Sequence, residues 1–203
     1  MSKLVFGVGI NDADYSVTCY ENLEDGKRRQ VWMCPFYRAW KNMMARGYSR
    51  KEKTKHPTYK DVTLCQEWLL FSNFSGWMQT QDWEGKQLDK DLLVNGNKVY
   101  GPENCVFVSA EVNKFLTDRG NDRGEHKIGV HWAKNVGKFM ARCSNPFTGK
   151  RDSLGLFSDE DEAHNAWLAK KLEHAKVLAS LQTDARITKA LIAKYENYGE
   201  LNE

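Results

Sequence analysis

Residues 128–157 read IGVHWAKNVGKFMARCSNPFTGKRDSLGLF. Three segments of this stretch have the length and composition of strands, and turn residues separate them: 128–132, 138–142 and 152–157. In the first two segments polar and apolar side chains alternate, so every second side chain faces the same side of a sheet. The stretch therefore predicts a small three-stranded sheet with two different faces.

A helix is predicted directly after this sheet. Ser158 and Asp161 resemble a capping box, and the residues that follow place apolar side chains at helical spacing. One face of the sheet should pack on this helix, which leaves the other face to polar side chains. We expect His164 and His174 to be exposed on the helix rather than to bind a metal.

The free face of the sheet is a candidate DNA contact. Arginine and lysine side chains on it can reach guanine edges or phosphates, and a sheet of this size fits the major groove. The alternation leaves open whether His131 or Trp132 lies on this face. The candidate contacts in this part of the chain are His131, Trp132, Lys134, Lys138, Arg142, Lys150 and Arg151.

Positive charge is concentrated in two blocks of the sequence. The formal net charge of the 203 residues is only +3. Residues 27–60, however, hold 11 Lys and Arg against 1 Asp or Glu, a net +10, and residues 118–151 hold 8 against 3, a net +5. Such blocks are the electrostatic footprint of a protein that binds a polyanion, and nucleic acid is the leading partner.

The first basic block contains a segment without apolar periodicity. Residues 47–57 are dense in cations and predict an exposed loop, after a helix over 35–46. A second aromatic-rich helix is expected over 65–78, broken near Ser72 and Asn73. The candidate phosphate contacts in the loop are Arg50, Lys51, Lys53 and Lys55.

Composition excludes several classes of protein. With 41% hydrophobic and 28% charged residues, the chain can bury a core and is not compositionally disordered. No run reaches the ~18–20 apolar residues of a membrane span, and the first residues do not form a secretory signal, so we expect a cytoplasmic protein with no membrane partner. The five cysteines contain no Cys-x-x-Cys pair, so we expect reduced thiols that pack in the core. Cys34, Cys65 and Cys105 are candidate zinc ligands, but without paired spacing we expect no zinc site there.

The predicted sheet and helix resemble a known DNA-binding module. The segments Gly129-Val130, Gly137-Lys138-Phe139 and Ala163-His164-Asn165-Ala166 are similar to those of the APETALA-type (ethylene-response-factor) domain. That domain is a three-stranded antiparallel sheet packed on one helix. The resemblance implies a DNA-binding domain over residues 125–180.

A second resemblance lies in residues 88–113. Leu88-Asp89-Lys90-Asp91, Pro102-Glu103-Asn104-Cys105 and Glu111-Val112-Asn113 resemble the HNH, or His-Me finger, nucleases, and in particular small phage-encoded members. The core of that family is a strand, a loop, a second strand and a helix. Local patterns agree with this order, since they predict strands over 87–92 and 105–108 and a helix over 109–116 capped by Ser109.

The nuclease resemblance implies metal-dependent hydrolysis of a phosphodiester. Asp89 and Asn113 would hold the metal, for which Mg²⁺ suits the hard oxygen ligands, and Asn104 would orient the base and its loop. The general-base His of the family falls on Lys90, and lysine is charged at neutral pH and accepts no proton. Asp91, or His56 from the basic loop, is an alternative base. Lys90 is an alternative phosphate clamp, and we expect it outside the core.

These interpretations give an α+β protein with four segments. They are an HNH-like domain with a His-Me finger (ββα) over 1–117, a linker over 118–124, the small sheet and its helix over 125–180, and a C-terminal helix over 181–203. The leading function is a DNA-binding endonuclease of the HNH type. The alternatives are a DNA-binding protein that does not cleave, on a degenerate HNH fold, and a phage protein that inhibits a host enzyme or defence complex in the host cytoplasm.

Overall fold

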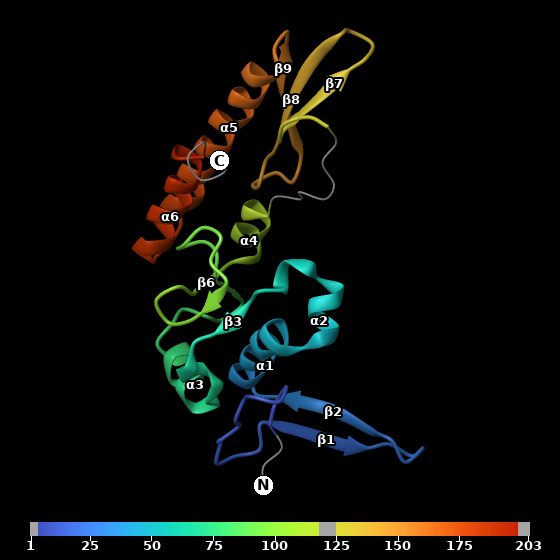
Figure 1. The fold of residues 1–203 in the computed structure, drawn as a ribbon, viewed down its shortest axis with the longest axis vertical. Coiled ribbons are helices and arrows are strands. Elements are labelled where there is room, and N and C mark those ends of the chain that lie inside the picture. The colour runs from blue at the N-terminus through green and yellow to red at the C-terminus, as the bar shows by residue number, and fades with distance from the viewer. Residues whose placement is uncertain (1–3, 118–124, 199–203) are drawn as a thin grey trace. The chain divides into compact units, whose positions relative to one another are not determined.

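A computed structural model of the chain describes residues 4–117 and 125–198. Figure 1 shows the elements in order along the chain, and their mixture of helices with small sheets confirms the predicted α+β class. The chain divides into two compact units, Met1–Val108 and Ser109–Glu203. The predicted linker over 118–124 lies outside the described residues.

Aromatic side chains form the core of the N-terminal unit. α1 (Pro35–Tyr48) begins at a proline, as the sequence predicts, and α3 (Phe71–Gln79) packs against it. The indole Nε1 of Trp40 donates to the carbonyl of Trp68 at 2.7 Å, so the largest buried side chain keeps its hydrogen bond. Around this bond lie the buried side chains of Met43, Met44, Val62, Phe71 and Phe74.

Two expectations for the N-terminal helices are wrong. The expected loop over 47–57 contains α2 (Arg50–Lys55) and the 3₁₀ turn η1 (Pro57–Tyr59). The Oγ of Ser49 accepts the amide of Glu52, and this cap lets a short polar helix form without an apolar face. The second helix is broken at Leu70, between η2 (Gln66–Leu69) and α3, rather than at Ser72 and Asn73.

Within residues 4–108 the structure has three separate two-stranded sheets. β1 (Thr18–Asn22) and β2 (Arg28–Met33) form an antiparallel hairpin, of which only the first strand is expected from the sequence. β3 (Thr63–Leu64) pairs in parallel with β5 (Val99–Tyr100). β4 (Gln87–Asp89) pairs antiparallel with β6 (Val106–Val108), which confirms the two predicted strands around the Asp89 loop.

The C-terminal unit is a three-stranded antiparallel sheet packed on a helix, as predicted. β7 (Val130–Ala133), β8 (Lys138–Ser144) and β9 (Arg151–Phe157) follow one another in the sheet. Figure 1 shows α5 (Glu160–Ser180) along one side of this sheet and α6 (Ala185–Glu196) beside α5. The Asp159 carboxylate caps α5 by accepting two amides, so the helix begins one residue later than the Ser158 cap predicts.

The buried side of the sheet is packed closely against α5. Ala141 and Cys143 of β8 are fully buried, and so is Ala163 of the helix. Gly129, just before β7, has a φ of +81°, and a Cβ atom there would lie 2.1 Å from Cγ of Trp167. Only glycine combines this backbone conformation with so close an approach of the indole ring.

A buried lysine joins α4 (Ala110–Leu116) to α5. The Nζ of Lys171 donates to the carbonyl of Phe115 at 2.8 Å and lies 3.7 Å from the centre of the Phe115 ring. The Tyr195 ring of α6 is 5.0 Å from the same nitrogen. Inside this unit, the ammonium group is thus stabilised by a hydrogen bond to a backbone carbonyl and by cation–π contacts with aromatic rings.

Candidate nucleic-acid interface

The strand register defines which side chains share the free face of the sheet. Ala141 and Cys143 point toward α5, so their neighbours along β8, Lys138, Met140 and Arg142, point the other way. The cross-strand pairs extend this face to both outer strands. We call it the open face, and it consists of His131, Ala133, Lys138, Met140, Arg142, Ser144, Arg151, Ser153 and Leu156.

The register also resolves the choice between His131 and Trp132. His131 pairs with Met140 and therefore lies on the open face. Trp132 pairs with Phe139 and lies on the same side of the sheet as Ala141, with its ring 4.8 Å from that of Phe139. Trp132 is thus not a neighbour of the cations on the open face, although 40% of its surface is exposed.

The charge of the open face has one sign. Lys138, Arg142 and Arg151 are exposed there, and Lys134 and Lys150 are exposed in the two adjoining turns. Asp152 is the only acidic residue in 130–157, and it pairs with Cys143 on the side of α5. None of the five cations forms an ion pair with a carboxylate of the described residues.

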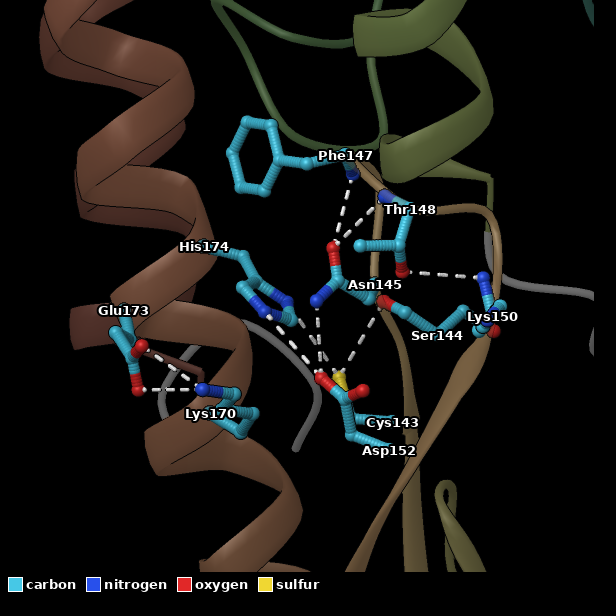
Figure 2. Close-up of polar contacts among 10 residues, drawn as sticks. All are labelled: Cys143, Ser144, Asn145, Phe147, Thr148, Lys150, Asp152, Lys170, Glu173 and His174. Atoms are coloured by element: carbon cyan, nitrogen blue, oxygen red, sulfur yellow. Dashed lines mark hydrogen bonds and ion pairs between the residues drawn. The ribbon is translucent and has the colours of Figure 1, made fainter.

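Asn145 organises the turn that presents Lys150 and Arg151. Figure 2 shows its side chain between the turn and α5. Its Oδ1 accepts the amides of Phe147 and Thr148 at 3.0 and 3.2 Å, and its Nδ2 donates to the carboxylate of Asp152 at 3.1 Å. Asparagine commonly binds the backbone of its own turn in this way, and the turn is therefore fixed on both sides.

A cysteine, a histidine and an aspartate meet beneath this turn (Figure 2). Sγ of Cys143 lies 3.9 Å from Nδ1 of His174, and Nε2 of His174 lies 4.0 Å from the carboxylate of Asp152. Burial raises the pKa of the Cys143 thiol and, together with nearby Lys170, lowers the pKa of His174. A buried thiol with a raised pKa is a poor nucleophile, so this group packs the sheet on α5 rather than performing catalysis.

The burial of His174 corrects the sequence interpretation. Only 3% of its surface is exposed, whereas its helical position predicts an exposed side chain. His164 is half-buried, and its Nδ1 bonds to the carbonyl of Ile128 at 2.9 Å. Both histidines face the sheet, because the side of α5 that packs on the sheet includes polar as well as apolar side chains.

The cations of α2 form a second basic surface, on the N-terminal unit. Arg50, Lys51 and Lys55 are exposed. Lys53 is different, since its Nζ donates to the carbonyls of Lys60 at 3.0 Å and Val62 at 3.3 Å and thereby holds the following turn. Three of the four predicted phosphate contacts in this segment are therefore accessible, and the fourth is used inside the protein.

The loop after β4 is closed by its own hydrogen bonds. Oδ1 of Asp89 accepts the amides of Asp91 and Leu92 at 2.9 and 2.7 Å. Asn97 binds the backbone of Lys90 and Val99 from the other side of the loop, each at 2.8 Å. Asp89 thus acts first as a cap for the turn that follows it.

Lys90 is inside the protein, contrary to the sequence-based expectation. Only 6% of its surface is exposed. Its Nζ donates to the carbonyl of Asn97 at 2.8 Å, forms an ion pair with Asp91 and lies 6.0 Å from the centre of the Tyr100 ring. The pattern misses this because the Asn97 carbonyl and the Tyr100 ring come from the far end of the loop.

This arrangement does not fit the catalytic roles assigned to Lys90 and Asp91. A lysine that donates to a carbonyl and a carboxylate is neither a proton acceptor nor a free phosphate clamp. Asp91 is itself engaged by Lys90. Tyr100 and Cys105, nearby, have pKa values raised by burial to about 12, so neither is ionised at neutral pH.

The remaining residues of the implied metal site, Asn104 and Asn113, belong to different compact units. Asn104 is half-buried, and its backbone amide donates to the carbonyl of Gly101 at 3.1 Å. Asn113 is half-buried on α4, in the C-terminal unit, whereas Asp89 belongs to the N-terminal unit. Over residues 4–117 and 125–198, no group of three or more His, Cys, Asp or Glu side chains is placed to hold a metal ion.

The donors around Asp89 do not form the oxygen-rich shell that Mg²⁺ takes in proteins. One carboxylate oxygen of Asp89 already accepts two backbone amides, and the ammonium group of Lys90 is paired with Asp91 in the same loop. Magnesium therefore stays a prediction from the resemblance alone.

Comparison of the chain with known proteins finds no matching family model, curated protein or solved structure. Within the described residues, no helix is both long enough and apolar enough to cross a membrane.

Proposed function

We propose that the protein binds double-stranded DNA through the open face of β7–β9. The observation that carries this proposal is the set of exposed cations on a face without a carboxylate, namely Lys138, Arg142 and Arg151. An arginine or lysine without an internal partner keeps its donors for a ligand, and arginine in particular can bind phosphate or guanine with two hydrogen bonds. A polyanion satisfies all three side chains at once.

The dimensions of the sheet favour a duplex. Successive residues on one face of a strand lie about 7 Å apart, so Lys138 and Arg142 of β8 are separated by about 13 Å, close to the width of about 12 Å of the major groove of B-DNA. The turns that carry Lys134 and Lys150 lie at opposite ends of β8. Cations at both ends can therefore reach phosphates on the two sides of one groove.

Titration of DNA binding against salt tests this proposal. The probe is a 30-base-pair duplex of random sequence, and the readout is fluorescence anisotropy at several salt concentrations. Each phosphate contact that is lost lowers the slope of log K against log salt by about 0.9. Replacing Lys138, Arg142 and Arg151 together by alanine should therefore reduce the slope by about 2–3 and weaken binding at least about tenfold.

Lys189→Ala is the matched control, because Lys189 is an exposed cation on α6 of the same unit. This variant should bind with the salt slope of the wild type. Circular dichroism should show that the triple variant is folded, since all three side chains are exposed. Equal slopes for the wild type and the triple variant would contradict the assignment of the open face.

Cleavage of DNA is a second candidate function. One observation favours it: β4, β6 and α4 follow in the order strand, loop, strand, helix that the nuclease resemblance implies, and Ser109 caps the helix by accepting the amide of Val112. The engagement of Lys90 opposes it. Binding without cleavage is therefore the function that the geometry supports better.

Supercoiled plasmid separates the two candidates. The protein is incubated with the plasmid and with magnesium, manganese or a chelator, and nicked, linear and shifted species are resolved on one gel. Asp89→Asn is the informative variant, because an amide oxygen preserves the two hydrogen bonds that Asp89 accepts. Metal-dependent nicking that this variant loses would establish a nuclease. A shift without nicking is the result we expect.

A further inference from the structure

A row of apolar side chains crosses the middle of the open face. Met140 of β8 pairs with His131 of β7 on one side and with Leu156 of β9 on the other. Leu156 is 44% exposed, and Met140 and His131 are half-buried. The core on the other side of the sheet does not use this row, because its side chains point away from α5.

Cations bracket this row along β8. Lys138 and Arg142 are each two residues from Met140 on the same face, which corresponds to about 7 Å on either side. The two cations are therefore separated by about 13 Å of strand, close to the width of about 12 Å of a major groove. When they contact phosphates on both sides of the groove, the apolar row faces the edges of the base pairs.

Base edges in the major groove differ in one apolar group. Only thymine carries a methyl group there, whereas the other edges present hydrogen-bond donors and acceptors. Methionine and leucine offer no hydrogen bond, and burying them against polar edges leaves those edges without their water. A flexible, polarisable methionine beside a leucine is instead well suited to a methyl group.

We propose that Met140 and Leu156 recognise thymine methyl groups, so that the open face prefers duplex DNA rich in A·T pairs. This inference rests on the proposed DNA binding and adds a preference for certain base sequences to it. The cations supply affinity for any sequence, and the apolar row between them supplies the difference between sequences. His131, at the β7 end of the row, presents an imidazole edge to the adjoining base pair.

Deletion of the methyl group itself tests the proposal. Two random 30-base-pair duplexes are prepared, one with thymine and one with deoxyuridine at every such position, and their dissociation constants are measured by anisotropy. The wild type should bind the deoxyuridine duplex about 3–10-fold more weakly, since two buried methyl contacts are lost. Leu156→Ala together with Met140→Gln should bind both duplexes equally.

Two controls keep the result specific. Arg142→Ala should weaken binding to both duplexes and preserve their ratio, because it removes charge and not the apolar row. Leu156→Ala alone, at an exposed position, should reduce the ratio without affecting the fold. A wild-type ratio of one, with binding intact, would overturn the methyl recognition and leave the proposed function standing. Failure to bind either duplex would overturn the proposed function itself.

Discussion

The loop after β4 and the open face of β7–β9 both carry basic side chains next to short strands, and they use them in opposite ways. Lys90 donates to Asn97 and Asp91 within its own loop and is almost fully buried. Arg142 is exposed and has no described carboxylate beside it. The first cation holds the protein together, and the second is available to a ligand.

The difference shows that a basic residue in a motif-like position says little about function until its partners are known. Lys90 occupies the position at which the nuclease resemblance expects a catalytic base, yet its donors are used for structure. Arg142 is marked by no motif except strand alternation. What separates the two is the presence of a carbonyl and a carboxylate within reach, which reduces the electrostatic attraction left for DNA.

The largest effect is expected from the buried side of the sheet. Gly129→Ala places a Cβ atom against Trp167 at a residue with φ of +81°, so both strain and overpacking oppose folding. We expect a loss of about 3 kcal/mol in the free energy of unfolding, measured by urea denaturation. Gly137→Ala, with φ of +63° and no atom within 4 Å, should cost about 1 kcal/mol. Equal losses in the two variants would contradict the close packing of Trp167 against Gly129.

An intermediate effect is expected at Lys90. Lys90→Ala leaves the carbonyl of Asn97 without its donor and removes the ion pair with Asp91, and we expect a loss of about 2–3 kcal/mol. Lys98→Ala, at an exposed lysine of the same loop, should change stability by less than about 0.5 kcal/mol. Denaturation followed by tryptophan fluorescence measures both. If Lys90→Ala were as stable as Lys98→Ala, Lys90 would not stabilise the loop, and its contrast with the exposed cations of the open face would be wrong.

The smallest effect is a pH dependence at His174. Burial lowers the pKa of His174 below 6.5 in the folded protein, so below pH 6.5 the unfolded chain takes up a proton first. His174 therefore contributes its full share to the free energy of unfolding above pH 6.5. This contribution is lost as the pH falls through the pKa that His174 has in the folded protein. The groups that face the ring are Cys143, Asp152, Lys170, Lys171 and Glu173.

Melting temperatures at pH 7.5 and 5.5 measure this dependence. The wild type should lose a few degrees more than His174→Gln between the two pH values, because glutamine does not titrate. His56→Gln, at an exposed histidine after α2, should behave like the wild type. A wild type and a His174→Gln variant with the same pH dependence would mean that the imidazole keeps its ordinary pKa despite its burial.

Much of the C-terminal unit could be predicted from the sequence. Alternation along residues 128–142 and the turn residues between strands are local signals, and they give β7, β8, β9 and the helix after them. They also place Lys138 and Arg142 on one face. The N-terminal unit is harder to predict from the sequence. β3 and β5 are two residues long and pair across 35 residues of chain, so no local periodicity indicates their pairing.

The sequence by itself determined the α+β class, the three-stranded sheet, the order of elements around Asp89 and the cations that reach the open face. The tertiary structure decided which polar side chains are used up inside the protein. Lys90, Lys171 and His174 lie in local patterns that do not mark them as buried, yet each is covered by groups outside its own helix or strand. Periodicity reports the direction of a side chain on its own element, whereas burial depends on what the rest of the chain brings to that side.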